Sequence, residues 1–352
     1  MTDDIVFSQT GDWGVITLNR PDALNALTMP MVTAFRAQLT SWEAHPKIRA
    51  VLIKGAGERA FCAGGDVRWL HDTAKEDPDA ACAFFREEYK NNAAIYHFPK
   101  PYVALIDGIV MGGGVGVSVH GDFRVAGDKT VFAMPETGIG LFPDVGGGHF
   151  MPRLHDGLGL YYALTGKRAK AADCMAAGIA THYAPSDDMA ALEQALLAAP
   201  LSARAHADIE AILDGASGDP GHGEINDRRG EIKTLMDGVD DFYDMLERLR
   251  VQNSQLSFEI LETIAGMSPT SLKLTFEQMK RGHTLDFDDV MAMEFRMVSR
   301  VMRGHDFFEG VRAQIVDKDR NPKWRPAMLN DISDADIAAY FEPLGDGELD
   351  LP

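Results

Sequence analysis

The sequence predicts a mixed α/β (α+β) fold, in which stacked ββα units form a core and helices form the C-terminal region. A short apolar run suited to a buried strand, a glycine loop and a helix follow one another near residues 50–70 and again near 102–121. This repetition indicates stacked units rather than two separate domains. Helical patterns then dominate the last third of the chain. We expect a core at 1–200, a linker at 201–230 and a helical region at 231–352 that covers a ligand site.

The first elements of the predicted core are a hairpin, a helix and a buried strand. Strands are expected at 4–8 and 13–18, on either side of a tight glycine turn. Apolar residues at helical spacing predict an amphipathic helix at Asn25–Ala44. Residues 50–54 are a short apolar run suited to a buried parallel strand. Asp66, after the loop that follows, is placed to cap the next helix.

The second half of the core repeats this order. A helix is expected at 79–97, and two prolines stop it. A buried strand at 102–106 leads into the glycine cluster 112–116, which opens a further helix through His120. Short strands follow at 123–126 and 130–133.

Beyond residue 150 the sequence is mostly helical. Residues 213–231 are rich in Gly, Asp and Pro and form the best candidate linker. The helical patterns after it lie at 238–250, 253–266, 269–281, 286–303 and 305–317, with a shorter one near 334–342. In the 305–317 helix, Phe307–Gly310 either contacts a ligand or simply packs.

Composition and charge restrict the classes of function. The 352 residues are 45% hydrophobic and 25% charged, as in a globular enzyme. A formal charge of −19 argues against nucleic acid as a partner and, more weakly, against an anionic membrane. Three widely spaced cysteines (Cys62, Cys82 and Cys174) form neither a disulfide framework nor a zinc motif. The acidic N-terminus does not resemble a signal peptide, and no apolar run reaches the length of a membrane span, so we expect a cytoplasmic protein.

The common glycine-rich and metal-binding motifs do not fit. The GGGVG run at 112–116 is not a dinucleotide fingerprint, and no phosphate-binding loop ending in Gly-Lys-Ser/Thr occurs. No Gly-x-Ser-x-Gly motif supports a serine hydrolase. His120 with Asp122, and His305 with Asp306, lack further ligands at metal spacing, so no metal is expected.

Two glycine loops each follow a predicted buried strand, at Ala63–Asp66 and Gly112–Gly114. Backbone N–H groups from two such loops can converge on one oxygen. That arrangement stabilises an oxyanion or an enolate formed from a carbonyl, commonly by about 3–4 kcal/mol per donor. The sequence therefore offers one way to activate a carbonyl group.

Carboxylates near these loops are candidates for acid–base or nucleophilic chemistry. Glu136 and Asp144 each stand beside a proline and apolar residues, in a segment (108–148) that holds 12 of the chain's 34 glycines. Glu88 shares a stripe of the 79–97 helix with aromatic residues, which predicts a half-buried side chain. A solvated Glu88 stays open, because the neighbouring Glu87 shows that this helix also has an exposed face.

These residues fall within a resemblance that covers almost the whole chain and is weakest at 186–260. The sequence resembles the crotonase (enoyl-CoA hydratase/isomerase) superfamily, and in particular its 3-hydroxyisobutyryl-CoA hydrolase branch. PETGIGLFPDVGGG at 135–148, HGDFRVA at 120–126 and FFREEY at 84–89 are the motifs most specific to that branch. Further similar segments are ITLNRPDALNALT at 16–28, AFCAGGDVR at 60–68, MSPTSLK at 267–273, MRGHDFFEGVRA at 302–313 and DKDRNPKW at 317–324.

The resemblance implies a crotonase-like ββα superhelix core and a set of site residues. These are Glu136 and Asp144 as catalytic acids, Gly65 and Gly113 as the oxyanion hole, and Glu88, Gly113, Ala63, Gly64 and Asp66 as substrate-binding residues, the last three lining the CoA channel. It implies an acyl-CoA substrate, with CoA as a part of the substrate and no retained cofactor. A homo-oligomer is also possible in this superfamily.

One departure from the superfamily bears on the reaction. A water-adding crotonase has a second glutamate just after the glycine cluster, where this sequence has Gly116 and no acid between Gly112 and Gly121. The resemblance therefore implies hydrolysis of a short β-hydroxyacyl-CoA thioester, namely 3-hydroxyisobutyryl-CoA of valine breakdown. Glu136 acts either as nucleophile or as general base. The alternatives are an enoyl-CoA hydratase or isomerase and a non-catalytic CoA-binding protein.

Overall fold

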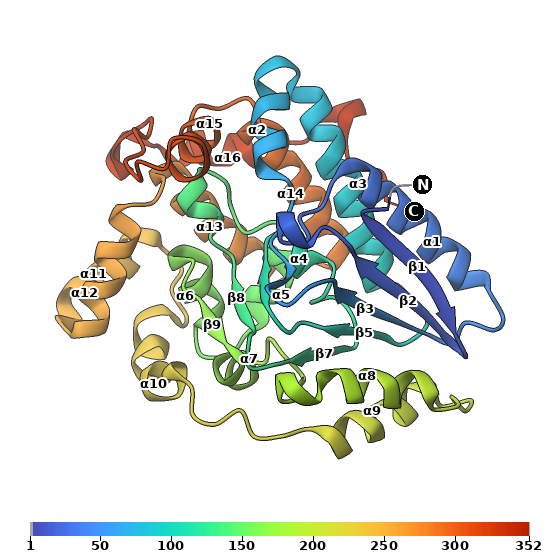
Figure 1. Ribbon diagram of the computed structural model, residues 1–352. Helices are drawn as coiled ribbons and strands as arrows, with labels where there is room; N and C mark the ends of the chain where they lie inside the picture. Colours follow the sequence, from blue (N-terminus) through green and yellow to red (C-terminus); the bar gives the residue numbers. More distant parts are fainter. Residues whose placement is uncertain (1–2, 352) are drawn as a thin grey trace. The chain divides into compact units, whose positions relative to one another are not determined.

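A computed structural model describes residues 3–351 and confirms the mixed α/β fold (Figure 1). The chain divides into two units whose segments alternate along the sequence. The first unit holds the residues up to Gly65, Lys90–Phe132 and Ala169–Asn226, and the second holds Asp66–Tyr89, Ala133–Arg168 and the chain from Asp227 on. Because neither unit ends near residue 200, this division differs from the predicted core, linker and C-terminal region.

A six-stranded sheet forms the centre of the first unit. Its order is β1 (Ile5–Thr10), β2 (Trp13–Leu18), β3 (Ala50–Gly55), β5 (Tyr102–Leu105), β7 (Phe123–Ala126) and β10 (His182–Tyr183). The predicted hairpin is antiparallel, and every later pairing in this sheet is parallel. The apolar runs of β3 and β5 are buried, as expected for parallel strands covered on both faces.

Two helices pack their apolar residues against this sheet. Leu192 and Leu196 of α8 (Met189–Ala198) and Ile209 and Leu213 of α9 (Ala205–Ala216) share one buried cluster with residues of β2, β3, β5 and β7. Figure 1 shows both helices running along the sheet. The prediction of a linker at 201–230 is therefore wrong for its first half, which is a helix docked on the core.

Helix α1 (Met29–Ala44) begins four residues later than predicted. Leu24 and Asn25 adopt left-handed φ angles of 52° and 57°, which a helix cannot contain. The Asn25 side chain instead accepts a hydrogen bond from Arg20 N at 2.9 Å and donates one to Ala60 O at 2.9 Å. Asn25 is thus a buried link between loops rather than the start of the helix.

A second sheet joins short strands in the order β4 (Ala60–Cys62), β6 (Ile109–Met111), β8 (Val131–Ala133) and β9 (Ala169–Lys170). Helix α4 (Gly113–Gly116) follows β6 and is shorter than the helix predicted through His120. It packs closely on β4, because a Cβ atom at Gly114 would lie 2.2 Å from Cys62 O. Helix α7 (Ala171–Ala177) completes the first unit.

The second unit is built mainly of helices, which confirms the helical patterns predicted beyond residue 231. Its helices are α2 (Val67–Glu76), α3 (Pro78–Tyr96, which ends in the first unit), α5 (Gly147–Phe150), α6 (Leu158–Thr165), α10 (Glu224–Met236, which starts in the first unit), α11 (Phe242–Gln252), α12 (Gln255–Ala265), α13 (Pro269–Gly282), α14 (Phe287–Val301), α15 (Asp306–Val311) and α16 (Asp334–Ala338). None of the helices within residues 3–351 is long and apolar enough to cross a membrane.

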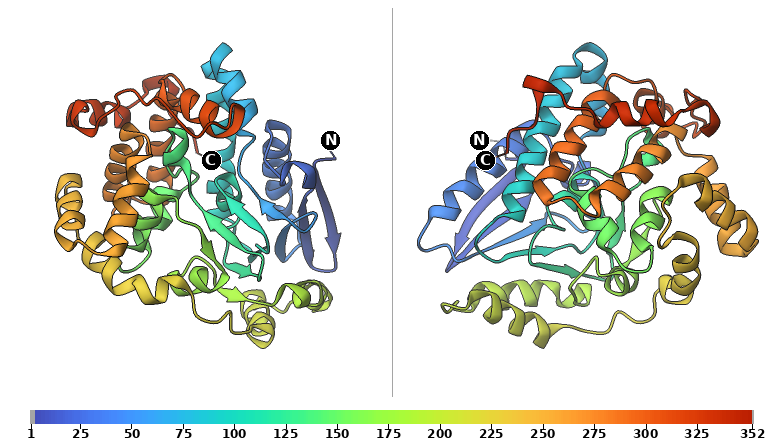
Figure 2. Two further views of the ribbon diagram at one scale, coloured as in Figure 1. Left: turned by 60° about the vertical axis from the view of Figure 1, so that its left-hand side comes forward. Right: turned by 180° about the vertical axis from the view of Figure 1, so that it is seen from behind.

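Helices α13 and α14 lie beside the segment that carries α5 (Figure 2). A Cβ atom at Gly282, the last residue of α13, would lie 1.9 Å from Gly148 O, so the two backbones touch. Both helices are largely buried along their length. Their side chains also bind the loop that precedes α5.

Candidate active site

The first unit brings the two predicted glycine loops together. One loop follows β4 and the other follows β6, and a Cβ atom at Gly64 would lie 3.6 Å from Gly113 N. Gly64 has a φ of 110° and Gly112 a φ of 47°, conformations that side chains other than glycine rarely adopt. Leu27 N donates a hydrogen bond to Gly64 O at 2.8 Å and fixes the first loop. The convergence of the Gly65 and Gly113 amides on one oxygen stays a prediction.

The second unit holds all three predicted acids. Glu88 lies on α3, Glu136 starts a 3-10 turn (Glu136–Ile139) just after β8, and Asp144 lies in the loop before α5. Their exposed fractions are only 3%, 5% and 3%, respectively. The alternative of a solvated Glu88 is therefore wrong.

Burial and mutual repulsion raise the pKa of the acids. Burial raises the pKa of Glu88 well above its usual value, and the charge of Asp144 raises it further. The pKa of Glu136 is raised well above its usual value by burial and then by the charges of Asp144 and Glu88, against a lowering effect of its own backbone N–H. The three carboxyl groups therefore resist being ionised together, as in acid–base pairs of enzymes.

Tyr89, which was not among the predicted site residues, contacts one of these acids. Tyr89 Oη donates a hydrogen bond to Asp144 Oδ2 at 2.9 Å, and both side chains are buried. Burial raises the pKa of Asp144 to about 7, although the Tyr89 hydroxyl lowers it. The only signal in the sequence is that Tyr89 adjoins Glu88 in the FFREEY motif.

Two carboxyl oxygens in the group have no hydrogen-bond partner among residues 3–351. They are Glu88 Oε1 and Glu136 Oε2. Leaving a buried polar atom unpaired costs roughly 1–3 kcal/mol, so such atoms call for a partner that the folded chain does not supply. Both oxygens are thus available to a substrate or a water molecule.

Segments around Glu136 fix its backbone. A Cβ atom at Gly310 would lie 2.4 Å from Ile139 C, and one at Gly140 would lie 2.2 Å from Asp306 C. The Phe307–Gly310 segment of α15 therefore packs directly against the turn that starts at Glu136. Phe307 is buried, which supports the packing alternative for this segment.

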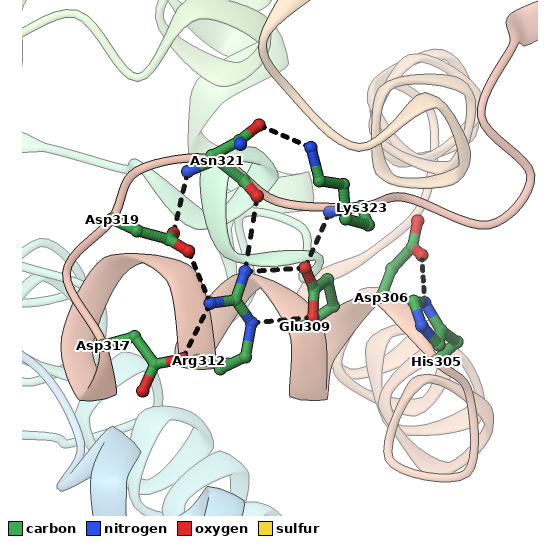
Figure 3. Close-up of polar contacts among 8 residues, drawn as sticks. All are labelled: His305, Asp306, Glu309, Arg312, Asp317, Asp319, Asn321 and Lys323. Carbon is green, nitrogen blue, oxygen red and sulfur yellow. Dashed lines mark hydrogen bonds and ion pairs between the residues drawn. The ribbon is translucent and has the colours of Figure 1, made fainter.

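Arg312 and Glu309 of the α15 region bind the DKDRNPKW segment (Figure 3). Arg312 donates hydrogen bonds to Glu309 Oε1 and Oε2 at 2.8 and 2.9 Å, and to Asp317 and Asp319 at 2.8 Å each. Lys323 N donates a further bond to Glu309 Oε1 at 2.7 Å. This network fastens the segment to the end of α15, so the motif has a structural role here.

The remaining predicted residues have separate outcomes. Asp66 caps α2 as expected, since its Oδ1 accepts a hydrogen bond from Trp69 N at 3.2 Å. The roles of Ala63, Gly64 and Asp66 in lining a CoA channel stay predictions. Gly116 is the buried last residue of α4, and the structure places no acid there.

Comparisons with known proteins find relatives over almost the whole chain. A family model described as enoyl-CoA hydratase/isomerase matches residues 13–341. The chain is 46% identical to a mitochondrial 3-hydroxyisobutyryl-CoA hydrolase of Xenopus tropicalis, over 99% of this chain and 91% of the relative. It is equally 46% identical to the protein of the same name from Homo sapiens, over 99% of this chain and 90% of the relative.

Two solved structures are similar over almost the whole chain. A carnitinyl-CoA dehydratase from Mycobacterium thermoresistibile has a TM-score of 0.91 and 40% identity, and covers 99% of both chains. An enoyl-CoA hydratase from Rhodobacter sphaeroides 2.4.1 has a TM-score of 0.90 and 35% identity, and covers 99% of this chain and 100% of its own.

Proposed function

Since the chain belongs to the enoyl-CoA hydratase/isomerase family, we propose that it is an acyl-CoA thioester hydrolase that acts on 3-hydroxyisobutyryl-CoA. Curated relatives at 46% identity carry this activity in their names. Within the chain, one observation supports it above the others. Glu136 and Asp144 are both buried, the charge of Asp144 raises the pKa of Glu136 after burial has raised it, and Glu136 Oε2 has no hydrogen-bond partner among the described residues.

Glu136 performs the central step in this proposal. Water attack on a thioester carbonyl needs a group that removes a proton, or a nucleophile that first forms an acyl-enzyme. Ionised Glu136 supplies either function through Oε2, which no other described group occupies. In both routes the carbon–sulfur bond breaks and CoA leaves as a thiol; water either attacks the thioester carbonyl directly or hydrolyses the anhydride that Glu136 has formed with the acyl group.

The other two acids bind the water and the substrate hydroxyl. The Tyr89 hydroxyl stabilises the ionised form of Asp144, and the charge of Asp144 in turn favours a protonated Glu88. A protonated carboxylic acid is a hydrogen-bond donor as well as an acceptor. We therefore assign Glu88 to the β-hydroxyl group of the acyl chain and Asp144 to the attacking water.

The glycine loops receive the thioester oxygen. The amides of Gly65 and Gly113 would donate to the negative charge that grows on this oxygen during attack. Two such donors commonly contribute about 3–4 kcal/mol each to stabilising the transition state. Ala63, Gly64 and Asp66 are proposed to line the path of the CoA moiety.

A hydratase is the second candidate, because the two similar solved structures are a dehydratase and a hydratase. Addition of water to a double bond uses two acids, one to activate water and one to protonate carbon. Gly116 occupies the position where the family's hydratases place one of them. This residue favours hydrolysis over hydration.

A substrate comparison tests the proposal. The purified protein is incubated with 3-hydroxyisobutyryl-CoA, isobutyryl-CoA or crotonyl-CoA, and free CoA is followed with a thiol reagent. We expect rapid CoA release from the first, slower release from the second, and no loss of crotonyl-CoA double-bond absorbance. Loss of that absorbance without CoA release would establish the hydratase instead, and tight CoA binding without turnover of any of the three would indicate a binding protein.

Several properties accompany this proposal. CoA enters and leaves as part of the substrate and product, so no retained cofactor is proposed. The substrate places the enzyme in valine breakdown. The cytoplasmic location expected from the sequence stays a prediction beside the mitochondrial location in the relatives' names, as does a homo-oligomer.

A further inference from the structure

The loop that carries Asp144 has a strained backbone. Val145 has a φ of 52° and Gly146 a φ of 84°, so two consecutive residues adopt the left-handed conformation. For a β-branched residue such as valine this conformation is uncommon and unfavourable. Such strain persists only where surrounding contacts hold it in place, which happens most often at functional sites.

One buried carboxylate holds this loop from outside the catalytic group. Glu294 of α14 is 0% exposed, and its Oε2 accepts a hydrogen bond from Gly146 N at 2.8 Å while its Oε1 accepts one from Gly148 N at 2.8 Å. Gln278 Nε2 donates to Glu294 Oε1 at 3.0 Å and to Pro143 O at 2.7 Å. The loop is therefore fixed on both sides of Asp144.

Gly148 allows the loop to approach Glu294 and Gln278 closely. A Cβ atom at Gly148 would lie 3.0 Å from both Glu294 Oε1 and Gln278 Nε2, so a side chain there would push these groups away by a few tenths of an ångström. The donors that meet Glu294 are all neutral N–H groups, and no cationic side chain within residues 3–351 pairs with it. Burial raises the pKa of Glu294 to about 8, while the three N–H donors oppose that rise.

The next residue of α14 positions the partner of Asp144. The Phe295 ring meets the Tyr89 ring edge to face, with centroids 6.4 Å apart and an angle of 84°. The guanidinium of Arg86, one turn before Tyr89 on α3, lies over the Phe295 ring, 4.3 Å from its centroid. Two consecutive residues of one helix thus hold the two ends of the Tyr89–Asp144 hydrogen bond.

We propose that Glu294 is a positioning residue that sets the place of Asp144, and hence of the attacking water, by fixing the backbone of Pro143–Gly148. A carboxyl group buried without a cationic partner is costly to keep, because it loses its contacts with water. Such a costly buried group is expected where it holds a reacting group in place, as Glu294 would hold Asp144. This role rests on the proposed function, since it assigns Glu294 to the same hydrolysis.

The test begins with Glu294→Gln, which keeps the size of the side chain but turns an NH2 group toward a backbone N–H. Displacing a reacting group by about 1 Å can cost about 10²-fold in rate. We expect kcat for 3-hydroxyisobutyryl-CoA to fall about 10–100-fold while KM changes less than about threefold. The matched control is Asp173→Asn, another buried carboxylate, which accepts a hydrogen bond from Ile225 N at 2.8 Å. Its kcat should stay within about twofold of wild type, since its hydrogen bonds to Lys170 N and Ile225 N lie within the first unit.

A double-mutant cycle separates positioning from general damage. If Glu294 acts through Asp144, then adding Glu294→Gln to Asp144→Asn should lower kcat no further. An equal fold loss in both backgrounds, or an unchanged kcat in the single variant, would overturn the proposal.

Hydrogen exchange keeps the test independent of turnover. We expect the amides of the 144–150 segment to exchange at least about tenfold faster in Glu294→Gln and at the wild-type rate in Asp173→Asn. If wild type releases no CoA, the proposed function fails, but the exchange rates still show whether Glu294 fixes the Pro143–Gly148 backbone. Unchanged exchange would overturn this role of Glu294 and leave the proposed function intact. If Glu294→Gln does not fold, Gln278→Leu replaces it, because it removes the donor to Pro143 O and Glu294 Oε1. We expect a smaller fall in kcat and a smaller rise in the exchange rate of the 144–150 amides. Unchanged exchange and unchanged kcat in that variant would overturn the proposal.

Discussion

Removing one hydroxyl group, by Tyr89→Phe, probes the electrostatics of the site. The Tyr89 hydroxyl is the side-chain donor that meets Asp144 Oδ2, at 2.9 Å, and both groups are buried away from water. This hydrogen bond lowers the pKa of Asp144, which burial otherwise raises. Without the hydroxyl, the ionised form of Asp144 loses its partner and its pKa must rise.

The size of the shift follows from the strength of the bond. A hydrogen bond to a charged group contributes about 1.5–3 kcal/mol. One pKa unit corresponds to about 1.4 kcal/mol. The pKa of Asp144 should therefore rise from about 7 by about one to two units in the variant.

The sign of the stability change depends on pH. Above the raised pKa, Asp144 is ionised in the folded state and the variant lacks the full contribution of the bond, about 1.5–3 kcal/mol. Below the wild-type pKa of about 7, Asp144 is protonated in the folded state and the loss is smaller. Tyr89→Phe should thus be more destabilising at pH 9 than at pH 5.5.

The assay is the pH dependence of kcat/KM for CoA release, from pH 5 to 10. The limb that belongs to Asp144 is identified as the one absent in Asp144→Asn. The control is Tyr183→Phe, whose hydroxyl donates to Asp128 Oδ1 at 2.5 Å in the first unit, outside the group of acids. A profile for Tyr89→Phe that overlays that of the control would refute the assigned role of the hydrogen bond.

Further consequences can be measured separately. Four buried acids, Glu88, Glu136, Asp144 and Glu294, have raised pKa values in the folded state. Their protonated forms stabilise the folded state at low pH, and this contribution is lost as pH rises through the folded pKa values. The free energy of unfolding in urea should therefore fall between pH 5.5 and 8.5, and a rise would contradict the burial of the acids. Asp144→Asn removes a charge that raises the pKa of Glu136, so the acidic limb of the residual kcat/KM should move to lower pH; a limb that stays or moves upward would contradict their proximity. Gly114→Ala should destabilise by about 1–3 kcal/mol in thermal or urea unfolding because its Cβ would meet Cys62 O, whereas Gly215→Ala, with open space around it, should not. In a single turnover in ¹⁸O-water, label entering Glu136 identifies it as the nucleophile, because a general base exchanges no oxygen with water; label in the acid product alone means that water attacked the acyl carbon, either directly or in the anhydride.

The parts of the site that could be predicted are those whose chemistry is local in sequence. Glu136 and Asp144 stand in a glycine-rich segment, and glycines there tolerate the φ angles that the loop needs. Helical spacing also predicted that Glu88 faces the interior, although burial is more complete than expected. The parallel strands β3 and β5 could also be predicted, because each is a short apolar run that is visible in the local sequence.

What could not be predicted depends on contacts distant in sequence. Glu294 lies 148 residues from Gly146, and nothing in its own helix marks it as a partner of that loop. Residues 201–230 have a loop-like composition, yet burial of Ile209 and Leu213 on the sheet makes part of it a helix. In these cases tertiary packing decides the outcome, and a sequence window does not contain the other half of the contact.

The most direct test of the account is CoA release from 3-hydroxyisobutyryl-CoA by wild type and by Glu136→Gln. The substitution keeps the shape of a buried side chain and removes its ability to act as a base or to form an acyl-enzyme. Wild type should release CoA at once, and the variant should be slower by about 10²–10⁴-fold with an unchanged melting temperature. Near-normal CoA release by Glu136→Gln would contradict the central role of Glu136.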